Sequence, residues 1–346
     1  MAGFLRGYIL QYIVLVFYLS SSSLIVDAIQ TRFVLNDRPI IGIVSQEVYN
    51  KSDYSLPPTS SYIAASYVKY VEGAGARVVP ILVDQDEAYL RRIFNSINGL
   101  LFPGGAIIFE YDNSTINNST KGFVSTGLFL MKLAKEANDK GDYFPVWGTC
   151  LGFEFMLFAE GNGQDARTQC QANNQLDKLR FQKDAMQSML FGKARKSVIN
   201  TLGTKAVTAN FHHLCLTPEN FTRFGLDQSY YLLSTSYDPV GNVTYVSAVE
   251  SINYPFFAVQ FHPEKNIYEW TKKENLPHSP EAIEAAQYFA MFYVDQARKN
   301  THSFNSTTEE EAHLIYNYIP TYTGLKGDTF VQKYFFPFDW SKKGYN

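Results

Sequence analysis

The stretch FPVWGTCLGFEFM (residues 144–156) carries the strongest structural signal in the chain. An apolar run ends in Gly148-Thr149-Cys150-Leu151-Gly152, and apolar residues then resume. A cysteine between two glycines, where two buried-looking segments join, is typical of a nucleophile held on a tight turn. The alternative is a small buried hydrophobe in front of a helix, which would not need the flanking glycines.

A strand, a turn and a helix around Gly-x-Cys-x-Gly resemble the nucleophile elbow, whose known form is Gly-x-Ser-x-Gly. Such a turn forces an unusual backbone at Cys150. The glycines on either side avoid clashes with the neighbouring strand and helix. The turn also sets the thiol at a helix N-terminus, where backbone N–H groups and the helix dipole favour thiolate over thiol.

The flanking sequence alternates short apolar runs with longer segments of helical pattern. Strands are predicted over 38–45, 77–83, 99–105 and 144–150, and helices over 60–76, 86–97, 126–139 and 279–300. Ser279 serves as the N-cap of the last helix and Pro280 as its first residue. This rhythm predicts an α/β fold with a mostly parallel sheet, organised as one domain over residues 29–346. From 170 to 202 the composition turns polar and basic, which indicates surface helices or an insertion.

A thiolate needs a base, and the chain has six histidines. His262 ends the strand-like run FFAVQF and is followed by Pro263 and Glu264. Residues two apart in an extended chain face the same side, so Glu264 is placed to accept from one ring nitrogen of His262. The other nitrogen would then face Cys150, as in a catalytic triad. A strand-end His-Pro turn beside a surface glutamate is the plainer alternative.

Acyl chemistry also needs hydrogen-bond donors for an oxyanion. Ligands of parallel α/β sheets bind beyond the carboxyl ends of the strands, and FPGG (residues 102–105) occupies that position. One backbone N–H group of this turn, together with the N–H of Leu151, would make a two-donor oxyanion hole. An ordinary strand-to-helix turn is the alternative.

The composition bounds the class of protein. The chain of 346 residues is 46% hydrophobic and 18% charged, with a net charge of −3. The near-neutral balance and the absence of a basic stripe argue against nucleic acid as a partner. Of the three cysteines, Cys150 is the candidate nucleophile, and Cys170 could pair with Cys215, though the sequence does not decide it. No Cys or His spacing suits a metal, so neither a metal nor a cofactor is predicted.

The N-terminus resembles a secretory signal peptide over residues 1–28. Arg6 is followed by the apolar run Tyr8–Leu19, and Val26 and Ala28 have the spacing of a cleavage site. An uncleaved membrane anchor is the alternative. Seven Asn-x-Ser/Thr sites support the secretory route and predict glycans; they begin at Asn50, Asn113, Asn117, Asn118, Asn220, Asn242 and Asn305.

The motifs FPGG, GTCLGFE and VQFHPE, in this order, resemble the class I glutamine amidotransferase-like superfamily, and within it the gamma-glutamyl hydrolase family. The stretches GDYFPVWGTCLGFE and FHPEKNIYEW extend the resemblance over nearly the whole chain after the leader. It implies a three-layer α/β sandwich of flavodoxin-like type, with Cys150 as nucleophile, His262 as general base and acid, and Glu264 as its partner. It also implies that Gly105 and Leu151 supply the N–H groups of the oxyanion hole. His212 matches a position expected near the substrate.

The resemblance also implies a substrate class. The enzyme would be an omega-peptidase that cleaves the γ-glutamyl amide bonds of folylpoly-γ-glutamates or antifolate polyglutamates. The alternatives are a glutaminase module that feeds ammonia to a synthase, and a non-catalytic secreted glycoprotein on the same fold. The family suggests lysosome, vacuole or secretion, with no membrane attachment after the signal is cleaved, and a homodimer. Activity near pH 5 would require a thiolate–imidazolium pair.

Overall fold

A computed structural model describes residues 35–48, 60–107, 109, 122–326 and 328–337. The described residues from 36 onward form one compact unit. The predicted signal peptide and the glycosylation sites at Asn50, Asn113, Asn117 and Asn118 lie outside the described residues.

The centre of the fold is an eight-stranded sheet in the order β4-β1-β5-β6-β14-β13-β12-β9. The first five strands of this order are parallel, and the last three continue the sheet in antiparallel fashion. In the order of the sheet the strands are Arg77–Ile81, Ile40–Val44, Gly99–Phe102, Val146–Thr149, Phe256–Val259, Val243–Ser251, Tyr230–Asp238 and Arg180–Phe181. Short, fully buried apolar runs are the pattern expected of parallel strands covered on both faces.

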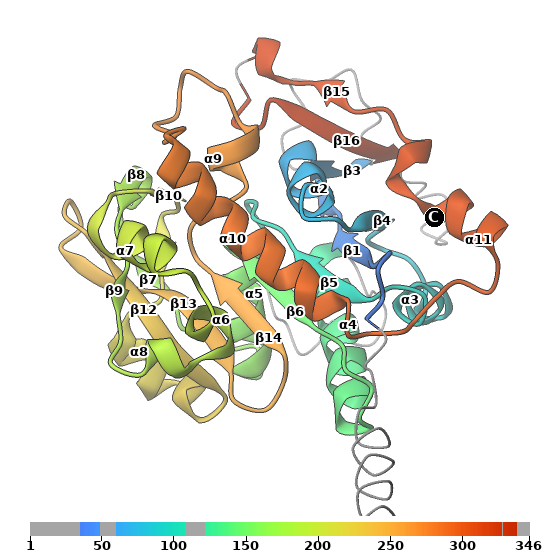
Figure 1. Cartoon of the computed structure of the whole chain (residues 1–346), viewed down its shortest axis with the longest axis horizontal. Coiled ribbons are helices and arrows are strands. Elements are labelled where there is room, and N and C mark those ends of the chain that lie inside the picture. The colour runs from blue at the N-terminus through green and yellow to red at the C-terminus, as the bar shows by residue number, and fades with distance from the viewer. Residues whose placement is uncertain (1–34, 49–59, 108, 110–121, 327, 338–346) are drawn as a thin grey trace, which may run out of the picture. The chain divides into compact units, whose positions relative to one another are not determined.

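Helices cover both faces of the sheet and give two separate cores (Figure 1). One core packs against α3, α4 and α5, which span Glu87–Phe94, Gly122–Asp139 and Leu151–Glu160. The other packs against α2, α7 and α10, which span Ala65–Glu72, Lys196–Thr204 and Pro280–Ala297. The predicted α/β sandwich with a mostly parallel sheet is confirmed.

The last long helix, α10, begins as the sequence predicts. Pro280 is its first residue, and the hydroxyl of Ser279 accepts a hydrogen bond from the N–H of Ala282 at 3.3 Å. This cap satisfies one of the N–H groups that a helix start leaves without an intrahelical acceptor.

The helix predicted over residues 60–76 begins later than the sequence indicated. Residues 60–64, predicted as the beginning of a helix, form strand β3 (Ser60–Ala64), and the helix α2 starts at Ala65. Strand β3 pairs with β16 (Gln332–Pro337) from the far end of the chain and with β2 (Gln46–Glu47). The strand β15 (Thr321–Tyr322) completes this four-stranded sheet. Pairing between segments so distant in sequence leaves no local pattern, and it overrides helical spacing.

The polar segment from 170 to 202 contains short strands as well as the predicted surface helices. Within this segment lie β8 (Asn173–Asp177) and α6 (Met189–Gly192), and β8 pairs with β10 (Thr208–Phe211). The remaining small elements of the fold are β7 (Thr168–Gln169), β11 (Leu214–Cys215), α8 (Pro218–Arg223), α9 (Lys265–Tyr268) and α11 (Thr307–His313). Strand β7 pairs with β11, and a disulfide between Cys170 and Cys215 ties the two together. The pairing that the sequence left open is therefore present. Among the described helices, none combines the length and the apolar character needed to cross a membrane.

Candidate active site

Cys150 stands on a sharp turn between β6 and α5. Its φ of 51° and ψ of −107° lie in a region that residues with a β-carbon rarely adopt. Its backbone N–H donates to the carbonyl of Val259 at 2.9 Å, which ties the turn to the adjacent strand β14. The thiol is free and only 5% exposed. Strain of this kind at a residue held by its surroundings is typical of functional sites.

The two flanking glycines are required by close packing. A β-carbon at Gly152 would overlap the carbonyl oxygen of Phe102 on β5 and lie 2.6 Å from the carbonyl carbon. A β-carbon at Gly148 would lie 2.7 Å from the carbonyl oxygen of Gly152 and 2.6 Å from the sulfur of Met156. The expected reason for the Gly-x-Cys-x-Gly pattern, close approach to a strand and a helix, is therefore present in the fold.

Three neighbouring parallel strands deliver the candidate groups to one edge of the sheet. Strand β5 leads to Gly104, β6 to Cys150, and β14 to His262. The three meet closely: a β-carbon at Gly104 would lie 2.6 Å from Cε1 of His262 and 3.2 Å from the β-carbon of Cys150. The site thus lies beyond the carboxyl ends of adjacent strands, where parallel sheets bind their ligands.

His262 and Glu264 form a buried pair. Nδ1 of His262 is 2.6 Å from Oε1 of Glu264, and the side chains are 4% and 0% exposed. Burial would lower the pKa of His262, but the Glu264 carboxylate and the Cys150 sulfur raise this pKa to about 10. The backbone N–H of His262 donates to Ala209 at 2.9 Å, so β10 fixes the loop that carries the pair. The ring therefore carries a proton through the acid and neutral range.

Tyr67, on α2, joins the two halves of the site and was not singled out by the sequence. Its hydroxyl accepts a hydrogen bond from the N–H of Gly104 at 2.8 Å and lies 3.3 Å from Nδ1 of His262. The ring is 1% exposed, and burial raises the pKa of the hydroxyl well above its ordinary value, so it stays protonated. In the sequence, Tyr67 lies at helical spacing with Tyr70 and Val71, as core residues do. This pattern gives no sign that its hydroxyl contacts the site.

The two predicted oxyanion donors lie beside Cys150. Leu151 is the first residue of α5, and Gly105 lines the same pocket as Cys150. Within the described part of the chain, neither N–H has a hydrogen-bond acceptor. The amide of Gln46 donates to the carbonyls of Pro103 and Gly104, each at 3.1 Å, which fixes the orientation of the loop.

His212 is buried and is not among the residues that line the pocket. Its Nδ1 is 3.3 Å from the sulfur of Cys215 and 3.6 Å from that of Cys170. Burial, reinforced by the nearby charge of His262, lowers the pKa of His212 to about 3, so the ring is neutral. These three residues come within 4.8 Å of one another, as metal ligands do, but the disulfide consumes both sulfur atoms.

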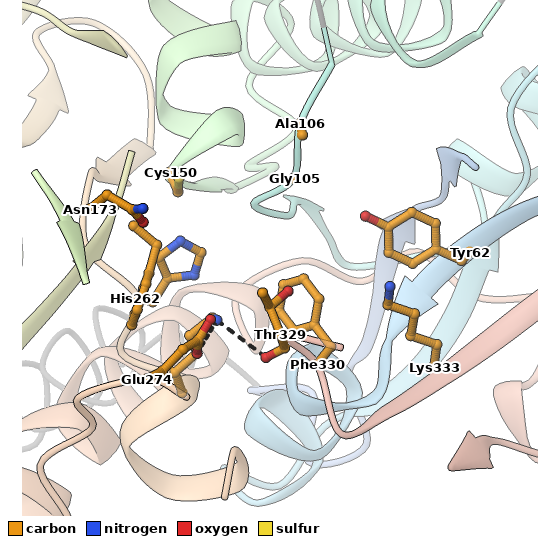
Figure 2. Close-up of a pocket in the computed structure, with 12 residues that line it drawn as sticks. Tyr62, Gly105, Ala106, Cys150, Asn173, His262, Glu274, Thr329, Phe330 and Lys333 are labelled. Carbon is orange, nitrogen blue, oxygen red and sulfur yellow. Dashed lines mark hydrogen bonds and ion pairs between the residues drawn. The ribbon is translucent and has the colours of Figure 1, made fainter. Parts of the chain in front are cut away.

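A cavity of about 220 Å³ opens onto Cys150 (Figure 2). Figure 2 shows Cys150, Asn173 and His262 on one side, Tyr62 and Lys333 on the opposite side, and Phe330 between them. The lining residues that the sequence did not single out are Tyr62, Ala106, Asn173, Phe211, Lys265, Glu274, Thr329, Phe330 and Lys333. Those near the C-terminus reach the site because β16 pairs with β3, and no local pattern could have revealed this.

The fold and this site place the chain among hydrolases that carry a cysteine nucleophile on an α/β sandwich. The family model for Peptidase C26 matches residues 39–264. Gamma-glutamyl hydrolase from Bos taurus is 39% identical over 300 residues, which cover 86% of this chain and 90% of that protein. Gamma-glutamyl hydrolase B from Dictyostelium discoideum is 39% identical over 290 residues, which cover 84% and 80%.

Solved structures share less of the sequence. The glutaminase domain of Trypanosoma brucei CTPS with bound acivicin is 15% identical, with a TM-score of 0.46, and the match covers 77% of this chain and 96% of that one. The family model and the relatives at 39% identity show that the chain belongs to the gamma-glutamyl hydrolases of the Peptidase C26 family and is a cysteine hydrolase. The resemblance noted in the sequence is confirmed.

Proposed function

We propose that the protein hydrolyses the γ-glutamyl amide bonds of folylpoly-γ-glutamates and of antifolate polyglutamates through a thioester on Cys150. The observation that carries the proposal is that Cys150, His262 and Gly104 meet at the ends of three adjacent strands. Glu264 contacts Nδ1 of His262. The relatives named gamma-glutamyl hydrolase support the same bond as substrate.

The first half of the reaction forms the acyl-enzyme. The Cys150 thiolate attacks the γ-carbonyl carbon, a C–S bond forms, and the oxygen becomes an oxyanion within reach of the N–H groups of Gly105 and Leu151. His262, protonated because Glu264 and Cys150 raise its pKa, gives its proton to the leaving amine as the C–N bond breaks. The departing product carries the remaining glutamyl chain.

The second half releases the acyl group. His262, now neutral, accepts a proton from a water molecule as the water oxygen attacks the thioester carbon. The C–S bond then breaks, the γ-carboxylate product leaves, and the thiolate and imidazolium are restored. Glu264 keeps Nδ1 as the protonated nitrogen throughout, so that the other ring nitrogen faces the reacting atoms.

The substrate assignment is tested by offering the wild-type protein pteroylpentaglutamate and glutamine in parallel. We expect glutamate or short γ-glutamyl peptides to be released from the first, measured by chromatography of the products, with far less ammonia released from the second. The ladder of products also shows whether internal or terminal bonds are cut. Ammonia release from glutamine without cleavage of pteroylpentaglutamate would favour a glutaminase and contradict the proposal.

The dependence of activity on pH tests the role of Glu264. In Glu264→Gln the carboxylate that raises the pKa of His262 is gone, while burial, which lowers it, remains. The imidazolium needed to protonate the leaving amine is then lost at a lower pH. We expect the alkaline limb of kcat/KM to move from near pH 10 to lower pH by one unit or more, so that the variant keeps its largest share of activity in acid.

The measurement is kcat/KM on one polyglutamate substrate from about pH 4.5 to about pH 11, so that the wild-type limb near pH 10 falls within the range. Glu136→Gln, at a half-exposed carboxylate on α4 away from the pocket, is the matched control and should keep the wild-type profile. An unshifted alkaline limb in Glu264→Gln would show that the carboxylate does not set the protonation of His262.

The same proposal includes how the protein is made and where it acts. Residues 1–28 are a signal peptide, and residues 29–346 are the hydrolase domain. The mature glycoprotein forms a homodimer and reaches a lysosome, a vacuole or the outside of the cell. Among the described sites, Asn242 and Asn305 are exposed and suited to carry glycans. The side-chain amide of Asn220 instead donates to Ala166 at 2.8 Å. His212 itself does not line the pocket, although Phe211, the residue before it, does.

A further inference from the structure

Two lysines line the pocket without taking part in the chemistry at Cys150. Lys265 is the first residue of α9, and Lys333 comes from β16. Their ammonium nitrogens lie 4.7 and 5.7 Å from the centre of one ring, that of Phe330. Lys265 is also 4.2 Å from the ring centre of Phe211, and Lys333 is 4.6 Å from that of Tyr62. Aromatic faces at these distances attract a cation and shield it from water.

Each lysine is held in place by one acid. Nζ of Lys265 is 2.6 Å from Glu274, and Nζ of Lys333 is 2.6 Å from Asp328. The Lys265 and Glu274 side chains are 2% and 7% exposed, and those of Lys333 and Asp328 are 12% and 13% exposed. Burying an ammonium group is costly without a partner, so these acids explain how the lysines are tolerated. They do not explain why two cations face a catalytic pocket.

The charges that line the pocket favour an anion. The lining residues include three basic side chains, His262, Lys265 and Lys333, against two anionic groups, the Glu274 carboxylate and the Cys150 thiolate of the proposed mechanism. Glu264 and Asp328 lie outside the lining. An ammonium group has three donors, and among the described residues those of Lys265 meet two oxygen acceptors, the carboxylate of Glu274 and the carbonyl of Thr329. A further carboxylate can therefore join the ammonium group while its own acid stays bound.

The substrate of the proposed function, on which this step rests, carries such carboxylates at regular intervals. Every residue of a γ-linked glutamate chain keeps a free α-carboxylate. We propose that Lys265 and Lys333 bind the α-carboxylates of two different residues of one chain, with Phe330 between them. The pocket thereby distinguishes a polyanionic γ-glutamyl chain from an isolated γ-glutamyl amide, because a ligand with one carboxylate fills only one of the two positions.

The test measures affinity, so that it does not depend on turnover. In the full-length Cys150→Ala protein, binding of tri-γ-glutamate is measured by calorimetry against analogues in which one α-carboxylate at a time is a carboxamide. We expect the analogue altered at a recognised position to bind about tenfold more weakly, as for loss of one charged hydrogen bond. Adding Lys333→Met should weaken the binding of unmodified tri-γ-glutamate by a similar factor. It should also remove the preference for carboxylate over carboxamide at one residue of the ligand.

The second cation needs a variant that leaves no buried charge without a partner. Lys265→Met combined with Glu274→Gln removes the ammonium and the acid together, and its melting temperature is recorded with its affinity. In this double variant, the preference for carboxylate over carboxamide should be lost at a different residue of the ligand from the one affected by Lys333→Met. Lys178→Met, at an exposed lysine outside the pocket, is the control and should bind every ligand as the parent protein does.

The outcomes separate this inference from the proposed function. Full discrimination between carboxylate and carboxamide in both lysine variants would overturn the two-cation site, even if the wild-type protein hydrolyses polyglutamates. Loss of discrimination at one and the same position in both variants would overturn the assignment of two separate carboxylates. Binding with the expected pattern, but no hydrolysis by the wild-type protein, would uphold this inference and reject the proposed reaction.

Discussion

Cys150→Ala is expected to abolish hydrolysis, lowering kcat on a polyglutamate substrate by a factor of about 10⁴ or more, as removal of a nucleophile does in other acyl-transfer enzymes. No other thiol can replace it, because the chain has three cysteines and the other two form a disulfide. The oxyanion donors and the substrate pocket remain, so binding should persist. The measurement is glutamate release at saturating substrate, followed by chromatography.

The fold should survive this change. Alanine keeps the β-carbon, so it adopts the backbone at φ 51° with the same strain as cysteine does, and only one sulfur atom is removed. The control is the thermal midpoint of unfolding, which should differ little from that of the wild-type protein. A well-folded Cys150→Ala protein that kept more than about one hundredth of the wild-type rate would show that the nucleophile is another group.

Gly152→Ala is expected to have the largest effect on stability of any single methyl addition in the site. The new β-carbon would overlap the carbonyl oxygen of Phe102, a backbone atom in a central strand with neighbours on both sides. Overpacking a core commonly costs about 1–3 kcal/mol, and a clash with fixed backbone should cost at least the upper figure. We expect a lower yield of folded protein and a lower midpoint of unfolding in denaturant.

The loss of activity should exceed what unfolding explains. Phe102 leads directly into Pro103 and the Gly104–Gly105 loop, so displacing its carbonyl moves the predicted oxyanion donor away from Cys150. Gly203→Ala is the matched control, because this glycine lies in helix α7 and a β-carbon there meets Phe181 at an ordinary 3.4 Å. Alanine is preferred to glycine in helices by up to about 1 kcal/mol, so that variant should be at least as stable as wild type. Equal stability of the two variants would contradict the close approach at the elbow.

The fold class and the placement of the cysteine were predictable from the sequence because both depend on local pattern. Buried parallel strands are written as short apolar runs, and Ser279 with Pro280 marks the start of α10. The elbow is local too, since Gly148 and Gly152 flank the residue whose backbone they make possible. His262 and Glu264 are two residues apart, so their contact also lies within reach of sequence reasoning.

The tertiary structure decided the rest, because it brings together residues that no local pattern connects. Tyr67 has the spacing of a core residue, and only the packing of α2 against the site sets its hydroxyl between Gly104 and His262. Strand β3 was predicted as helix because its partner β16 lies some 270 residues further along the chain. That same pairing carries Phe330 and Lys333 to the pocket.

The sequence by itself thus determined the nucleophile's turn, its candidate base and the class of fold. Each of these depends on residues that are close together in the chain, through the backbone geometry of a turn or the periodicity of apolar residues. The tertiary structure alone decided that Cys170 and Cys215 are joined, that His212 does not line the pocket, and which cations do line it. These features depend on side chains that meet only after distant strands have paired, because contact between them is set by the packing of the whole domain and by no repeat along the chain.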